Sequence, residues 1–175
     1  MPTNTAAWLM AKQTKLEVKP APYVNPREGE IVIKNHAVAI NTIDWVIQVA
    51  GNIVFSWIKY PFILGADLSG EVVEVGKGVA HFKVGDRVLG HAVGTDKKRN
   101  RSAEGAFQEY TVILAQLAAP IPSTMPYDKC RCSAPGLVYG SLRPVSERSS
   151  SAAIPPLQIQ NLQVKLFLFG EDLRV

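Results

Sequence analysis

The segment PFILGADLSGEVVEVGKGVAHFKVGDRVLG occupies residues 61–90 and combines short β-branched runs with closely spaced glycines. Residues 71–75 (EVVEV) predict a strand. Asp86 suits a tight turn that leads into Arg87 and Val88, because an aspartate side chain can bond its own backbone amides two residues on. The glycines mark positions where the backbone is expected to bend or to take positive φ, namely 65, 70, 76, 78, 85 and 90. Together these features predict a small β-barrel.

The same segment matches, in order, the pattern P-x-x-x-G-x-D-x-x-G-x-V-x-x-V-G followed by G-D-R-V. The matching residues are Gly65, Asp67, Gly70, Val72, Val75, Gly76, Gly85, Asp86, Arg87 and Val88. In this pattern the chain resembles the N-terminal, GroES-like domain of medium-chain dehydrogenase/reductases. The resemblance implies a mainly β fold over residues 1–129, a partly open GroES-like barrel with short helices. A generic small β-barrel without a dehydrogenase relationship is the alternative.

The length of 175 residues allows one domain with a sizeable core. Family members carry a second, dinucleotide-binding domain after the barrel, whereas these residues contain no G-x-G-x-x-G fingerprint. We therefore expect the Rossmann domain to be absent from this chain. Cys130 and Cys132 are one residue apart, a spacing that suits neither a disulfide nor a zinc site.

The net charge is +4, and part of the excess lies in the run Lys97, Lys98, Arg99 and Arg101. We interpret this run as a solvated loop, with a phosphate or nucleic-acid contact as the alternative, and predict no nucleic-acid partner. No apolar run is long enough to span a membrane, and the first residues lack the pattern of a signal peptide. A soluble, cytoplasmic protein without membrane association is expected.

Further strands and helices are predicted from the periodicity of apolar residues and from residues that begin or end such elements. Residues 30–41 alternate polar and apolar side chains and predict a strand with one buried face. Thr42 is expected to cap a short helix, Ile43–Ala50, which Gly51 ends. The remaining elements are strands over 5–10, 15–18 and 106–114, and the first turn of a helix within 123–129.

The motif positions of the family define the candidate site. Zinc-dependent members carry a cysteine in C-x-x-D where this chain has Asn41-Thr42-Ile43-Asp44, and G-H-E where it has Gly65-Ala66-Asp67. Zinc requires thiolate or imidazole ligands at such positions, so we predict no metal. Asn41 is the candidate catalytic and cofactor-binding residue, because its amide can donate toward substrate or cofactor. Thr42 is a candidate cofactor contact, and Asp44 is either a cofactor contact or a structural residue at the helix start.

The resemblance also implies that residues 51–60 border the cleft between the two domains of the full-length family. The bulky residues Phe55, Trp57 and Tyr60 are candidates for a substrate pocket, with core packing as the alternative. The three histidines, His36, His81 and His91, are scattered along the chain and are interpreted as surface or packing residues rather than ligands or bases.

For the intact family member, the resemblance implies NAD(P)H-dependent, zinc-free hydride transfer, with NADPH as cofactor, to a small enoyl or quinone-type substrate, as in quinone reductases and fungal trans-enoyl reductases. The present chain is expected to be an N-terminal fragment that is inactive alone and binds no cofactor. The barrel face that normally packs on the cofactor domain could then support self-association. The alternatives are a non-catalytic GroES-like binding or scaffold module and a pseudogene product.

Residues 130–175 lose both helical and strand periodicity and are rich in Ser, Pro and Arg, a composition typical of a disordered tail. The genetic code offers a second interpretation. Permitted codons for residues 135–154, read from the second base, give LVLSTAACGLFQKDHLQLQY; those for 155–175, read from the third, give PSPNPKPTGKTLLVWGGSSS. These two translated segments resemble, respectively, the family's linker helix and the start of its cofactor domain. Residues 130–175 are accordingly interpreted as an out-of-frame remnant.

Overall fold

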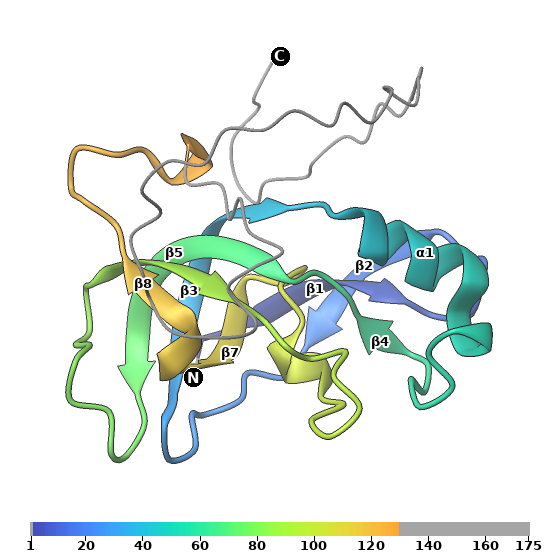
Figure 1. The fold of residues 1–175 in the computed structure, drawn as a ribbon, viewed down its shortest axis with the longest axis horizontal. Helices are drawn as coiled ribbons and strands as arrows, with labels where there is room; N and C mark the ends of the chain where they lie inside the picture. The colour runs from blue at the N-terminus through green and yellow to red at the C-terminus, as the bar shows by residue number, and fades with distance from the viewer. Residues whose placement is uncertain (1, 130–175) are drawn as a thin grey trace, which may run out of the picture. The chain divides into compact units, whose positions relative to one another are not determined.

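Two antiparallel sheets form the framework of residues 2–129, the part of the chain that the computed structural model describes (Figure 1). The smaller sheet has the strand order β2 (Leu16–Ala21), β1 (Asn4–Leu9), β4 (Phe62–Ile63). The larger sheet has the order β7 (Tyr110–Leu114), β3 (Glu30–Ala39), β5 (Asp67–Val75), β6 (Arg87–His91), β8 (Ala118–Pro120). The helical elements of this part are α1 (Thr42–Ala50) and the 3₁₀ turns η1 (Gly51–Ile53), η2 (Ser102–Glu104), η3 (Ala115–Leu117) and η4 (Tyr127–Lys129). The prediction of a mainly β, partly open barrel with short helices is confirmed.

Several local expectations need correction. The helix begins at Thr42 and its N-cap is Asn41, one residue earlier than predicted. The carboxylate of Asp86 accepts a hydrogen bond from the backbone N–H of Lys83, 2.9 Å away, rather than from amides that follow it. The predicted strand over 106–114 is shorter, β7, and Gln108 forms an isolated bridge with Ala6 instead. Within 123–129 the chain forms only the 3₁₀ turn η4.

The glycines of residues 61–90 serve two different purposes. Gly65, Gly78 and Gly85 take positive φ. Gly70 instead allows close approach of strands, because a Cβ atom there would lie 2.1 Å from the backbone oxygen of Lys34 on β3. The pairing of β3 with β5 is irregular at this point, with register shifts on both sides of the contact. These glycines therefore permit the bent, tightly packed sheet on which the site is built.

Two separate cores stabilise the fold. The first lies on the larger sheet and is formed mainly by Ile31, Ile33, Leu68, Val72, Val88 and Ile113, all at most 1% exposed. The second joins α1 to the smaller sheet and contains Leu9, Ile47, Ile58, Phe62 and Leu64. Ile47 is the buried apolar residue of α1, whereas Ile43, Trp45 and Val49 are exposed. The helix is thus anchored on one narrow side only.

Other predictions lie partly or wholly outside the described residues. The domain boundary after residue 129, the out-of-frame interpretation of residues 130–175 and the assignment of Cys130 and Cys132 stay predictions. In residues 2–129, no helix is both long enough and apolar enough to cross a membrane.

Candidate functional site

Three strands of the larger sheet bring the motif residues together at one edge. In the antiparallel register, Asp67 at the start of β5 lies opposite Ala39 at the end of β3 and opposite His91 at the end of β6. Asn41 follows Ala39 by two residues and precedes α1. The sheet register therefore places Asn41, Asp67 and His91 next to one another, although 26 and 24 residues separate Asp67 from the other two.

Asn41 has an extended backbone (φ −106°, ψ 158°) and turns the chain from β3 into α1. Its backbone N–H donates to Oδ2 of Asp44 at 2.8 Å, an arrangement typical of a helix start. Its side-chain Nδ2 donates to Oδ2 of Asp67 at 3.1 Å. Within the described residues Nδ2 donates no other hydrogen bond, which leaves its second N–H able to donate to a ligand. Thr42, the predicted cofactor contact, is exposed on the first turn of the helix.

Asp44 is buried and links the helix to the loop before β5. Its exposed fraction is 5%, and its Oδ1 accepts the backbone N–H of Gly65 at 3.0 Å. Burial raises the pKa of the Asp44 carboxyl, and the nearby Asp67 adds to this increase, while the hydrogen bonds from Asn41 and Gly65 oppose it. These contacts match the structural role considered for Asp44, and a cofactor contact stays a prediction.

Asp67 is shared between two donors. Its Oδ2 accepts from Asn41, and its Oδ1 lies 3.0 Å from Nδ1 of His91. Burial alone would raise the pKa of Asp67, but the hydrogen bonds from His91 and Asn41 outweigh it and hold the pKa below its ordinary value. Sequence reasoning missed His91 as a member of this cluster. A hairpin built from strands 67–75 and 87–91 was the signal that could have found it.

The donor set at the motif positions does not fit a tetrahedral zinc ion. Asn41 offers an amide and Ala66 a methyl group where zinc-dependent proteins of the resembled family have a cysteine and a histidine. In residues 2–129, no three or more His, Cys, Asp or Glu side chains are grouped so that they could hold a metal.

The aromatic candidates Phe55, Trp57 and Tyr60 all pack against the second core and are partly buried. The rings of Phe55 and Trp57 meet edge to face with centroids 5.4 Å apart. Trp57 Nε1 donates to the backbone oxygen of Thr95 at 2.9 Å. The hydroxyl of Tyr60 is buried without a hydrogen-bond partner in the described part of the chain. These contacts are those of core packing, and a role in a substrate pocket stays a prediction.

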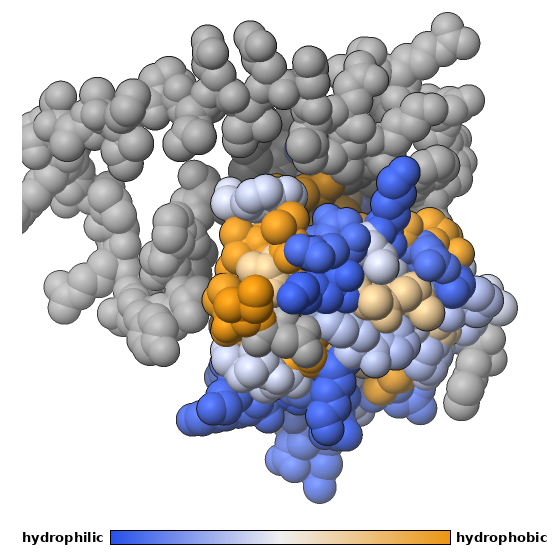
Figure 2. All heavy atoms as spheres, turned by 90° about the vertical axis from the view of Figure 1, so that its right-hand side faces the viewer, coloured by the Kyte–Doolittle hydropathy of each residue, from blue (hydrophilic) through white to orange (hydrophobic). Residues whose placement is uncertain are grey.

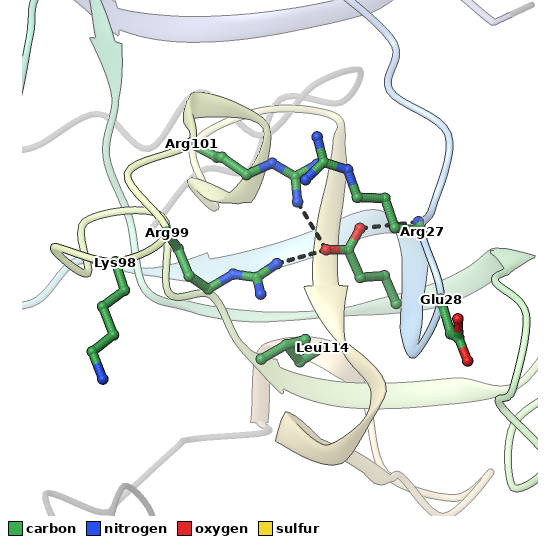
Figure 3. A pocket seen from close by; sticks show the side chains of 7 residues that line it. Arg27, Glu28, Lys98, Arg99, Arg101 and Leu114 are labelled. Carbon is green, nitrogen blue, oxygen red and sulfur yellow. Dashed lines mark hydrogen bonds and ion pairs between the residues drawn. The ribbon is translucent and has the colours of Figure 1, made fainter.

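A surface cavity of about 350 Å³ is lined by Arg27, Glu28, Glu30, Lys98, Arg99, Arg101 and Leu114 (Figure 3). Glu30 and Glu104 are at most 3% exposed, and their carboxylates accept hydrogen bonds from Arg99 and Arg101. The solvated-loop interpretation is therefore wrong for Arg99 and Arg101, whose charges are paired with buried carboxylates. It holds for Lys97 and Lys98, which are exposed. These ion pairs join the start of β3 to the loop that carries both arginines.

Large apolar side chains are exposed along α1 and the turn that follows it. They include Ile43, Trp45 and Val49 on the helix and Ile53 and Val54 after it, with exposed fractions from 41% to 78%. Figure 2, which views the molecule from the right-hand side of Figure 1, shows hydrophobic surface among hydrophilic side chains on this side. This surface, Ile43 to Val54, is called the α1 face below.

Comparison with known proteins matches the family described as alcohol dehydrogenase GroES-like domain to residues 27–123. Dehydrogenase pigH of Monascus ruber is 61% identical over 129 residues, 73% of this chain and 35% of the relative. Trans-enoyl reductase himH of Aspergillus japonicus is 41% identical over 125 residues, 70% of this chain and 35% of the relative. The Escherichia coli quinone oxidoreductase complexed with NADPH superimposes with a TM-score of 0.55 at 26% identity, over 73% of this chain and 35% of that chain.

The chain belongs to the alcohol dehydrogenase GroES-like domain family, and the match places it in the N-terminal part of medium-chain dehydrogenase/reductases. It spans about a third of the length of the curated relatives that it matches. The resemblance deduced from residues 61–90 is confirmed.

Proposed function

We propose that residues 1–129 form the substrate-side domain of a zinc-independent, NADPH-dependent reductase that transfers hydride to an α,β-unsaturated carbonyl or a quinone. The observation that carries this proposal is the polar cluster around Asn41. At the position of the zinc-ligating cysteine stands an amide whose Nδ2 is held 3.1 Å from Asp67 and retains a free N–H. A fixed amide donor suits an acceptor whose oxygen gains negative charge.

The chemistry assigned to Asn41 is electrostatic. When hydride reaches the β-carbon of a conjugated acceptor, negative charge develops on the carbonyl oxygen, and a preorganised N–H stabilises that charge without reorganisation. Asp67 holds one N–H of the amide and so fixes the orientation of the other. Asp44 supports the same arrangement from behind, because its buried carboxylate joins the Asn41 backbone to Gly65.

NADPH, when bound, supplies the hydride. The described residues offer it only a partial surface, for which Asn41, Thr42 and Asp44 are the proposed contacts. NADPH rather than NADH is supported by the E. coli quinone oxidoreductase, whose structure was solved with NADPH. We further propose that these residues by themselves, which contain no G-x-G-x-x-G fingerprint, neither bind the cofactor nor catalyse, and that the protein is cytoplasmic.

A domain exchange tests the function directly. Residues 1–129 of this chain would replace the matching segment of the Monascus ruber dehydrogenase, with which they share 61% identity. We expect the chimera to consume NADPH in the presence of a small quinone or a conjugated enone. Asn41→Ala in the chimera is expected to lower kcat by about 10²-fold, the usual cost of one oxyanion donor. Asn25→Ala, which removes an exposed amide elsewhere, is the matched control.

Two results would contradict the proposal. A folded chimera that binds NADPH but reduces neither class of acceptor would leave the scaffold function as the better explanation. NADPH could also raise the thermal midpoint of the 175-residue chain itself, which would show that the chain binds the cofactor, since a ligand stabilises by mass action only the state that binds it. A scaffold or a fragment without a cofactor site gives no such shift.

A further inference from the structure

His91 is the one histidine of residues 2–129 whose ring is held by a carboxylate. It ends β6, where the sheet register sets it opposite Asp67. His36 instead stacks on the ring of Tyr127, and His81 lies against Phe82, with its Nε2 at 3.5 Å from a backbone oxygen. The environment of His91 is therefore different in kind, and it adjoins the cluster assigned to the reaction.

The contact with Asp67 determines which ring nitrogen carries a proton. An ionised carboxylate has no proton to donate and can only accept. The hydrogen bond of 3.0 Å between Oδ1 of Asp67 and Nδ1 of His91 therefore requires a proton on Nδ1. In the neutral imidazole, this leaves Nε2 with a lone pair, and in the imidazolium it leaves Nε2–H as a donor.

Nε2 of His91 is available to a ligand. It makes no hydrogen bond within the described residues and is not among their buried, unpaired polar atoms. The side chain is 32% exposed, compared with 13% for Asp67. The ring is thus held at Nδ1 by Asp67, while Nε2 is free to bind a ligand. Because Asp67 bonds both residues, the free N–H of Asn41 and Nε2 of His91 belong to one hydrogen-bonded cluster.

We propose that His91 is the proton donor of the reductase reaction and that its imidazolium form delivers the proton from Nε2 to the oxygen of the reduced acceptor. This inference rests on the proposed function. The hydride, which NADPH would supply by loss of one of its C–H bonds, forms a C–H bond at the acceptor carbon, and the conjugated π electrons shift so that a pair moves onto the carbonyl oxygen. That oxygen then takes the Nε2 proton, so that an O–H bond forms and an N–H bond breaks. The neutral imidazole, still bonded through Nδ1–H to Asp67, regains its proton from solvent through its exposed side.

The first test needs no cofactor domain. In the full chain labelled with ¹⁵N-histidine, long-range ¹H–¹⁵N correlations report the tautomer of each neutral ring, with His36 and His81 as internal references. We expect neutral His91 to be the Nδ1–H tautomer. Asp67→Asn, which keeps the shape but removes the obligate acceptor, should shift His91 toward the Nε2–H tautomer. A wild-type chain in which neutral His91 carries its proton on Nε2 would overturn the proposal.

The second test uses the domain-exchange chimera. We expect His91→Ala to lower kcat by about 10²-fold or more, a typical cost of losing a general acid, with little change in KM for the quinone. Added imidazole should restore kcat in proportion to its concentration, because it can enter the vacated, partly exposed space. His81→Ala is the matched control and should leave kcat unchanged.

The outcomes separate the two proposals. A chimera that is active but insensitive to His91→Ala, or whose His91→Ala variant imidazole does not rescue, overturns the proton-donor role and leaves the proposed function standing. A chimera with the wild-type segment that is folded but inactive overturns both, while the tautomer measurement still decides whether Asp67 fixes the His91 ring.

Discussion

The guanidinium group of Arg87 lies over the ring of Tyr127, 4.2 Å from the ring centroid. The same group donates to the backbone oxygens of Pro122, Ser123 and Met125 at 3.2, 2.7 and 2.6 Å. Arg87 belongs to the G-D-R-V motif, so this motif residue ties β6 to the segment that leads to η4.

We expect Arg87→Lys to loosen this segment. A lysine keeps the charge but lacks the planar fork that reaches several carbonyls at once. Because the contacts are solvent-exposed, the loss in free energy of unfolding should be modest, about 1–2 kcal/mol. Amide hydrogen exchange over residues 123–128 should become faster, while exchange in β3 and β5 should not. Lys83→Ala, which removes an exposed cation whose side chain makes no hydrogen bond or ion pair in the described residues, should change neither quantity.

Glu104 is the buried centre of the ion-pair cluster and is fully buried. Its carboxylate bonds both Arg99 and Arg101. Glu104→Gln should lower the free energy of unfolding by about 2–3 kcal/mol, because it weakens two charge-assisted hydrogen bonds to a buried carboxylate, while Glu30 still pairs with both arginines. Glu17→Gln is the control, since the pair of Glu17 with Lys19 is nearly half exposed and should contribute less than about 1 kcal/mol. Urea denaturation of both variants gives the comparison, and equal losses would contradict the prediction.

Comparing substitutions at Gly65 and Gly85 distinguishes the cost of backbone strain from the cost of a steric clash. Both have positive φ, +94° and +92°. A Cβ atom at Gly65 would lie 2.5 Å from the Phe107 ring, whereas at Gly85 no atom lies within 4 Å. Gly85→Ala should therefore cost about 1 kcal/mol from backbone conformation alone. Gly65→Ala should cost several-fold more by thermal denaturation, and it should also disturb the N–H bond to Asp44.

The pKa shifts at the site predict a specific pH dependence of stability. The pKa of Asp67 is lowered in the folded state, so its stabilising contribution is complete above the ordinary aspartate pKa and is lost as pH falls from there through the lowered, folded-state pKa. Asp67→Asn should flatten the decline in unfolding free energy between about pH 5 and pH 3. The pKa of Asp44 is raised, so its contribution has the opposite sign and falls as pH rises above the ordinary value. Asp44→Asn should therefore steepen the acid decline, and the same change in both variants would be inconsistent with these shifts.

Local sequence signals predicted most of the larger sheet and the position of α1. The alternation over residues 30–41 and the glycines flanking residues 71–75 depend on neighbours in the chain, so both strands were found. The bounds of β3 were close to those predicted, whereas β5 begins at Asp67, before the predicted start at residue 71. Asn41 and Asp44 were found because they stand at defined positions of a short motif. Their contact also is local, since Asp44 accepts the Asn41 backbone N–H within one helical turn.

Contacts between distant residues could not be predicted in the same way. The pairing of Asp67 with His91 depends on strand register across a hairpin, and a slip of one residue would turn His91 to the other side of the sheet. The pairing of Glu30 with Arg99 and Arg101 joins the start of β3 to a loop about 70 residues later. In the sequence those arginines are indistinguishable from the exposed Lys97 and Lys98, because only the fold decides which cations meet a buried carboxylate.

The α1 face provides the last prediction, which concerns self-association. Trp45 is 53% exposed and Ile53 is 78% exposed, and apolar residues of this size left in water favour burial against another surface. We expect the chain to form concentration-dependent oligomers in sedimentation velocity, and the double substitution Trp45→Lys with Ile53→Lys to shift it toward monomer. Val84→Lys, at a residue that is 62% exposed but lies outside the α1 face, is the control and should leave the oligomers intact. The thermal midpoints of both variants should match that of the wild-type chain, since none of these side chains belongs to either core. Oligomers that persist after the double substitution would exclude the α1 face as the contact.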